Sequence, residues 1–110
     1  MKALVVIDGG ICGFQTRAHA ESEDSQNVAF KIASGCEKVK KFGDVLTAKG
    51  PVDGYAEIGA GADGVVLTTA RENLKGCCAA CAVPCGVFKV MQVAAGVALP
   101  QDVTLKITAE

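Results

Sequence analysis

The chain has 110 residues, half of them apolar, with eleven basic and twelve acidic side chains. A single domain of this size hides roughly two-thirds of the surface of its unfolded chain, so it can build a core without disulfides. The apolar content excludes intrinsic disorder. The net charge of −1 comes without a basic stripe, so we expect neither nucleic acid nor a membrane as a partner.

The unusual feature of this composition is its cysteine content, with six cysteines in 110 residues. The apolar run at residues 3–7 is too short for the core of a signal peptide, and no apolar stretch has the length of a membrane span. We therefore expect a cytoplasmic protein, in which thiols stay reduced. In that compartment cysteines favour metal binding, redox chemistry or burial over a disulfide framework.

The N-terminal part of the chain predicts three strands. Residues 3–7 form a short apolar run that is typical of a buried strand. Residues 14–21 and 28–33 alternate apolar and polar side chains, as half-exposed antiparallel strands do. Turn-forming residues at 8–13 and 22–25 separate the three segments.

Two helices are predicted in the middle of the chain. Ser34 and Glu37 have the spacing of a capping box, and Gly50-Pro51 would end the helix that they begin. A second helix is expected to start after Asp63 as its N-cap and to end at Gly76 as its C-cap.

The remaining segments predict a third helix and a final strand. Pro84 suits the first turn of a helix whose apolar face continues to Ala98, and Pro100 marks its exit. Residues 103–107 alternate apolar and polar side chains and predict a strand. Residues 52–62 are ambiguous between a short strand and an irregular segment.

These elements predict a single domain over residues 1–110. The fold class is α+β, with a mainly antiparallel sheet of about four strands and three helices on one face. Strand direction places Cys12, after the first strand, at the same end as Cys36, after the third. If the first helix descends and the second returns, residues 77–85 arrive at that end too. All six thiols would then lie together.

The cysteine spacing predicts a metal site. Cys78-x2-Cys81-x3-Cys85 puts three thiolates in one tight loop, and soft thiolates select zinc, copper(I) or iron–sulfur clusters. Four cysteines are the usual set for structural zinc or a cubane cluster. We therefore expect a small metal- or iron–sulfur-binding module with zinc or an iron–sulfur cluster as its cofactor. The predicted ligands are Cys78, Cys81 and Cys85, with Cys36, Cys12 or Cys77 completing the set.

Two alternatives stay open, and with them whether the protein is an enzyme. The first is a thiol–disulfide redox protein that uses the pair Cys77/Cys78 or Cys81/Cys85. The second is an interaction module with structural, buried thiols, in which the Val- and Ala-rich third helix packs against a second copy. The expected partners are accordingly a second copy of the chain or a redox or metal-delivery protein.

Two other features are interpreted structurally. Gly59-x-Gly61-x-x-Gly64 matches the dinucleotide fingerprint, but no βαβ unit surrounds it, so we interpret these glycines as the entry to a helix. His19 is the single histidine and is expected on the polar face of its strand.

Three segments carry a resemblance to a known family. They are Ile11-Cys12-Gly13-Phe14, Ser34-Gly35-Cys36, and residues 77–86 leading into Val93-Ala94-Ala95-Gly96. Together they resemble a family of small uncharacterised cysteine-rich proteins from anaerobic bacteria and archaea, over the whole chain. The family has no established activity, so the resemblance implies no catalytic residues. An anaerobic source would favour reduced thiols and labile clusters.

Overall fold

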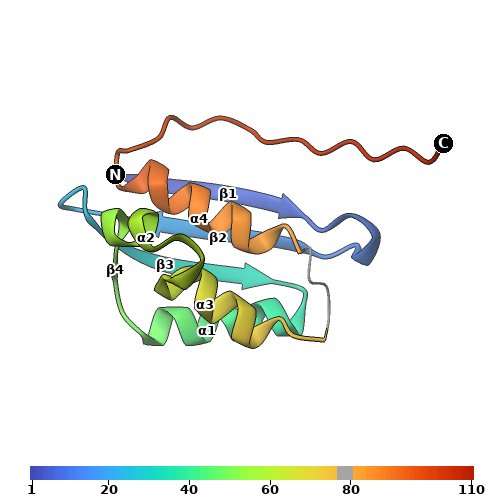
Figure 1. The fold of residues 1–110 in the computed structure, drawn as a ribbon, viewed down its shortest axis with the longest axis horizontal. Coiled ribbons are helices and arrows are strands. Elements are labelled where there is room, and N and C mark those ends of the chain that lie inside the picture. The colour runs from blue at the N-terminus through green and yellow to red at the C-terminus, as the bar shows by residue number, and fades with distance from the viewer. Residues whose placement is uncertain (77–80) are drawn as a thin grey trace.

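The computed structural model describes residues 1–76 and 81–110. An antiparallel sheet in the order β1-β2-β3-β4 forms one layer, and the α-helices lie against one face of it (Figure 1). The predicted α+β class is confirmed. The strands are β1 (Lys2–Asp8), β2 (Gln15–Glu21), β3 (Asn27–Ser34) and β4 (Val52–Asp53), and the helices of the described residues are α1 (Glu37–Ala48), α2 (Gly54–Ala60), α3 (Val65–Asn73) and α4 (Val83–Ala94), with 3₁₀ turns η1 (Gly10–Cys12) and η2 (Gly61–Asp63).

The core lies between the sheet and the helices. Alternate residues of β2 and β3 are buried, among them Ala18, Val28 and Phe30, while their neighbours face the open side of the sheet. Helix α4 covers β1 and β2, α1 covers β3, and α3 packs on both helices. None of the described helices combines the length and the apolar character needed to cross a lipid bilayer.

The start of α1 differs from the predicted capping box. Its N-cap is Cys36, and no side chain caps the helix. Ser34 is still the last residue of β3, and its hydroxyl oxygen accepts the backbone N–H of Cys36 at 3.1 Å and shares a 2.8 Å hydrogen bond with Thr16. The predicted stop is confirmed, because the helix ends at Ala48 and Gly50 adopts a left-handed φ of 82°.

Residues 52–62 contain an additional helix, so the prediction of three helices is wrong by one. The two residues of β4 pair with β3, and α2 follows directly. Asp53 is the N-cap of α2, and its carboxylate accepts the backbone N–H groups of Tyr55 and Ala56. A short helix of this kind leaves too few turns for a visible 3.6-residue pattern.

The predicted ends of the other two helices shift by a few residues. Helix α3 has Gly64 rather than Asp63 as its N-cap, and its C-cap is Leu74 rather than Gly76. Pro84 lies in the first turn of α4 as predicted, but this helix ends at Ala94 and not near Ala98.

The predicted final strand at 103–107 is wrong for the isolated chain. Residues 99–110, here called the tail, have no regular secondary structure and are exposed throughout. In the view of Figure 1 the tail leaves the end of α4 near the N-terminus and runs in the same direction as β1, and none of its residues joins the sheet. Alternation alone does not make a strand, because the backbone groups of an extended segment need a hydrogen-bonded neighbour.

Candidate functional site

The described segments that carry predicted site residues lie toward one end of the sheet, as expected. The η1 turn, the start of α1 and the start of α4 all lie beyond the ends of β1 and β3 (Figure 1). A Cβ built on Gly35 would lie 3.2 Å from Cδ1 of Phe14, so the loop before α1 packs against the loop after η1.

The described thiols at this end do not form a metal site. Within residues 1–76 and 81–110, no group of three or more His, Cys, Asp or Glu side chains could hold a metal ion. Cys36 and Cys81 pack against the hydrophobic core, whereas Cys12 and Cys85 are exposed. Cys77 and Cys78 lie outside the described residues. The prediction of a zinc or iron–sulfur module is therefore wrong, because those of its ligands that the structure describes are divided between the core and the surface.

The redox alternative is corrected by the same geometry. No two of the described thiols lie within disulfide distance, although Cys81 and Cys85 are close in sequence. Cys85 is in the first turns of α4 and faces solvent, while Cys81 precedes the helix and is half-buried. The other predicted pair, Cys77 and Cys78, lies outside the described residues.

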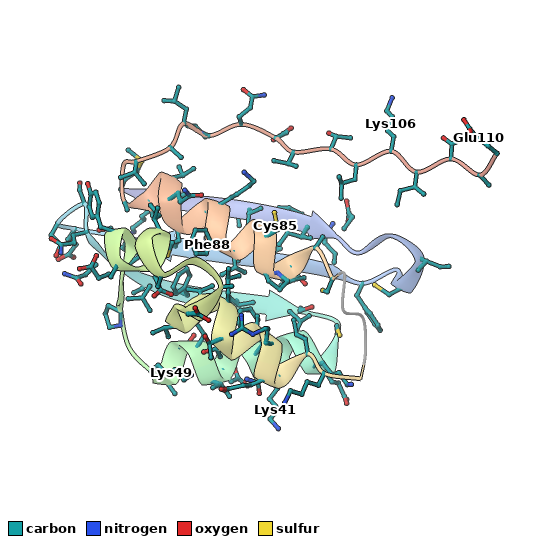
Figure 2. All side chains as sticks on the ribbon, in the orientation of Figure 1. Lys41, Lys49, Cys85, Phe88, Lys106 and Glu110 are labelled. Atoms are coloured by element: carbon teal, nitrogen blue, oxygen red, sulfur yellow. The ribbon has the colours of Figure 1, made fainter. Side chains whose placement is uncertain are left out.

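What the structure does bring together at this end is a groove between α3 and α4. It has a cavity volume of about 1060 Å³. Cys85 and Phe88, labelled in Figure 2, contribute to its lining from α4. The described lining residues are Ala62, Leu67, Ala70, Arg71, Leu74, Lys75, Gly76, Cys81, Pro84, Cys85, Phe88, Lys89 and Gln92. We call this surface the α3–α4 groove.

The groove combines an apolar base with positive charge. Leu67, Leu74 and Phe88 supply the large apolar side chains of its lining. Its charged lining residues within the described chain are all basic, namely Arg71, Lys75 and Lys89. Such a surface attracts anions through a summed field, which is stronger than any single exposed charge provides.

Contacts around the groove hold part of this charge in place. The Arg71 guanidinium donates to the carbonyl oxygen of Ala62 and lies 4.0 Å from the carboxylate of Asp63. Asp63 is almost fully exposed, so this pair neutralises Arg71 only weakly. Lys38, from α1, donates to the carbonyl oxygen of Lys75 at 2.8 Å and adds a fourth cation close to the groove.

Both helical walls are fixed by close contacts. The buried carboxylate of Glu57 accepts the backbone N–H groups of Val65 and Val66 and thereby caps α3. On α4, a Cβ at Gly86 would lie 2.4 Å from Cδ1 of Ile7, so glycine allows the helix to approach β1. These contacts make the groove part of the folded framework.

The open face of the sheet is the other hollowed surface described. It has a volume of about 460 Å³. Its charges are mixed, since Lys2 lies 3.9 Å from Glu21. His19 lines this face between Leu4 and Lys31 of the neighbouring strands and is exposed as predicted. The mixed charges give this face no preference for one class of ligand, so the α3–α4 groove is the better candidate site.

Sequence reasoning missed most of the groove. One side of α3 carries residues with helical spacing, namely Leu67, Ala70, Arg71 and Leu74. Arg71 is the charged residue at the border of this apolar face. On α4, Cys85 and Lys89 are four residues apart and therefore share a side of the helix. The spacing within each helix can be seen in the sequence. That these two helix faces line one groove follows only from the tertiary structure.

Fold and groove define a small, cysteine-rich α+β protein with helices on one face of an antiparallel sheet. Residues 3–107 match a protein family of unknown function, DUF6951, and the chain belongs to that family. The predicted resemblance to an uncharacterised family is thereby confirmed. No curated protein and no solved structure matches the chain.

Proposed function

We propose that the protein is a binding module for a small amphipathic anion, a molecule with an apolar body and a carboxylate head. The observation that carries this proposal is the α3–α4 groove, whose described charged lining residues are all cations over an apolar base. Binding sites for small molecules commonly have this composition, with mostly apolar walls and a few polar groups that fix orientation.

The apolar part of the ligand would lie against Leu67, Leu74 and Phe88. Leu74 is already buried, and the groove leaves Leu67 and Phe88 half-buried. Each Å² of apolar surface that a ligand removes from water contributes about 25 cal/mol. An extended hydrocarbon chain that covers these side chains therefore gains binding energy without a specific polar contact.

The carboxylate head would lie near Arg71, Lys75 or Lys89. These side chains are exposed, so each contributes little on its own in water. A guanidinium can accept a carboxylate through two parallel hydrogen bonds, and this geometry favours Arg71 as the principal contact. The groove should consequently bind an amphiphilic anion more tightly than an amphiphilic cation of the same chain length.

The test is a titration of the ¹⁵N-labelled full chain with decanoate, below its micelle concentration, followed by two-dimensional NMR. We expect shifts of the amide signals of residues 62–76 and 81–92, with those of β3 unchanged. Decyltrimethylammonium is the matched probe, with the same hydrocarbon chain and the opposite charge. It should bind at least about tenfold more weakly, a ratio that corresponds to one favourable charge interaction.

Two variants separate the groove from the rest of the surface. Arg71→Ala should weaken decanoate binding, whereas Lys41→Ala removes an exposed charge on α1 that does not line the groove and should leave it unchanged. Equal affinity for the anionic and cationic probes would overturn the charge argument. Absence of any shift in the groove signals at saturating decanoate would overturn the site.

A further inference from the structure

Within residues 1–76 and 81–110, no strand pairs with the outer edge of β1. The backbone N–H of Ser22 donates to Met1 at 3.0 Å, and the N–H of Gly9 donates to Phe14 at 2.9 Å, so the odd-numbered residues form the hydrogen-bonded pairs with β2. The backbone groups of the even-numbered residues therefore point to the other side, where the sheet order places no strand. These residues are Lys2, Leu4, Val6 and Asp8.

Between Lys2 and Asp8, this edge lacks the usual protection against a further strand. It is seven residues long and contains no proline. Leu4 and Val6, whose backbone groups face outward, have apolar side chains that are each 44% exposed. Natural sheets commonly block such edges with charges, prolines or bulges, so an open apolar edge indicates a docking site for a strand.

The tail has the pattern of the missing strand. Val103, Leu105 and Ile107 alternate with polar residues and are 60%, 78% and 94% exposed. They repeat the period-two spacing of Ala3, Val5 and Ile7 on the core-facing side of β1. Figure 2 shows the tail, with Lys106 and Glu110 labelled, running apart from the helices, and its side chains project to both sides. An exposed apolar segment of this kind needs a partner to leave water.

We propose that the tail of one copy adds as a fifth strand to the β1 edge of a second copy. Each chain has one such edge and one such tail, so a reciprocal exchange satisfies both edges and both tails and closes a two-fold dimer. The added strand gains main-chain hydrogen bonds from the outward-facing groups of β1, as in recognition by strand addition.

The tail of a second copy fits the β1 edge better than the chain's own tail does. In the view of Figure 1 the tail runs in the same direction as its own β1 without joining the sheet, and Leu105 and Ile107 remain 78% and 94% exposed. Pro100, just before the alternating residues, limits the conformations through which the tail could fold back, and it favours an extended residue before it. The connection therefore disfavours a fold-back onto the same chain, and the exposed tail is accessible to another chain.

The decisive variants remove one outward-facing N–H from the edge. Val6→Pro deletes a donor that points away from β2, and proline is tolerated at such edge positions. Val6→Ala is the matched control, because it shortens the same side chain and keeps the N–H. We expect a dimer mass in multi-angle light scattering for the full chain and for Val6→Ala. For Val6→Pro the dimer dissociation constant should rise about tenfold or more, and a chain ending at Ala98 should have the mass of a monomer.

Circular dichroism identifies any variant that has simply unfolded, and in that case Leu4→Pro and Leu4→Ala repeat the comparison at the other central edge position. A monomeric full chain would overturn the proposal, even if slow amide exchange showed the tail paired with its own β1. A dimer that survives removal of the tail would also overturn it, since the β1 edges or another surface would then form the contact.

Discussion

Glu57 caps a helix that begins eight residues later in the chain. Its Oε1 accepts a 2.6 Å hydrogen bond from the backbone N–H of Val66, and its Oε2 accepts one of 3.0 Å from Val65. The first N–H groups of a helix have no partners within the helix and carry partial positive charge, so a carboxylate is well suited to this place. The position of α3, and with it one wall of the groove, depends on this side chain.

Replacing Glu57 by alanine should therefore destabilise the fold. The side chain is only 4% exposed, so its removal leaves two N–H groups without their acceptor. We expect a loss of about 2–3 kcal/mol in the free energy of unfolding, measured by urea denaturation. Glu57→Gln keeps one acceptor oxygen and should lose less. The exposed Glu72 provides the control, and Glu72→Ala should change stability by less than about 0.5 kcal/mol. Equal losses for both alanine variants would contradict this role.

The same cap explains why Gly64 precedes α3. Its φ of −75° is available to any residue, but an added Cβ would lie 2.8 Å from Oε2 of Glu57. Gly64→Ala should thus displace the carboxylate and destabilise the protein by about 1–3 kcal/mol. Gly59 lies in α2 with nothing within 4 Å of its added Cβ, so Gly59→Ala should stabilise by about 0.5–1 kcal/mol. Thermal unfolding of the two variants should move in opposite directions, and parallel shifts would refute the assignment.

The glycine motif shows what sequence reasoning can and cannot supply. The letters of Gly59-x-Gly61-x-x-Gly64 suggest nucleotide binding, and the absence of a surrounding βαβ pattern correctly favours a helix entry. The separate reasons for the glycines need the structure, since Gly61 adopts a left-handed φ of 57° and Gly64 makes room for Glu57. No local pattern marks Glu57 as a cap, because its partners follow eight and nine residues later.

The strands and the cysteines also show which features the sequence predicts and which need the structure. Period-two alternation predicted β2 and β3 correctly because each of these strands has a partner close in sequence. The same pattern at 103–107 gave a wrong prediction for the isolated chain, because alternation does not specify which strand a segment pairs with. The four described cysteines lie toward one end of the sheet as strand direction required, but direction does not determine where each sulfur points. That is why Cys36 faces the core and Cys85 faces solvent.

Two aspartates at the other end of the sheet make stability depend on pH. The side-chain amide and backbone N–H of Asn27, with the N–H of Gln26, hold the pKa of Asp24 far below its ordinary value of 3.8. The side chain of Gln26 and the N-terminal N–H groups of α2 lower the pKa of Asp53. Each folded carboxylate binds protons less readily than its unfolded counterpart. Their stabilisation is therefore fully present above the unfolded pKa and is lost as the pH falls through the folded values.

The free energy of unfolding should accordingly fall between pH 4 and pH 2, a window set by the ordinary value of 3.8 and the lowered folded pKa. Asp24→Asn removes one of the two titrating groups, so its stability should decline less over this range than that of the unmodified protein. Urea unfolding at pH 7, 4, 3 and 2 measures both slopes. A variant slope as steep as that of the unmodified chain would show that other groups control the acid response.

Occupancy of the groove should protect one thiol. Cys85 lines the α3–α4 groove and is exposed, so iodoacetamide reaches it in the free protein. Cys12 is also exposed but lies in η1, outside the groove, and it serves as the internal control. With decanoate at ten times its dissociation constant, the alkylation rate of Cys85 should fall about tenfold, because only about a tenth of the sites remain free. Mass spectrometry of peptides from a time course gives both rates in one sample. Equal slowing of Cys12 would mean that decanoate acts on the reagent or on the fold as a whole, and an unchanged rate at Cys85 would place the ligand elsewhere.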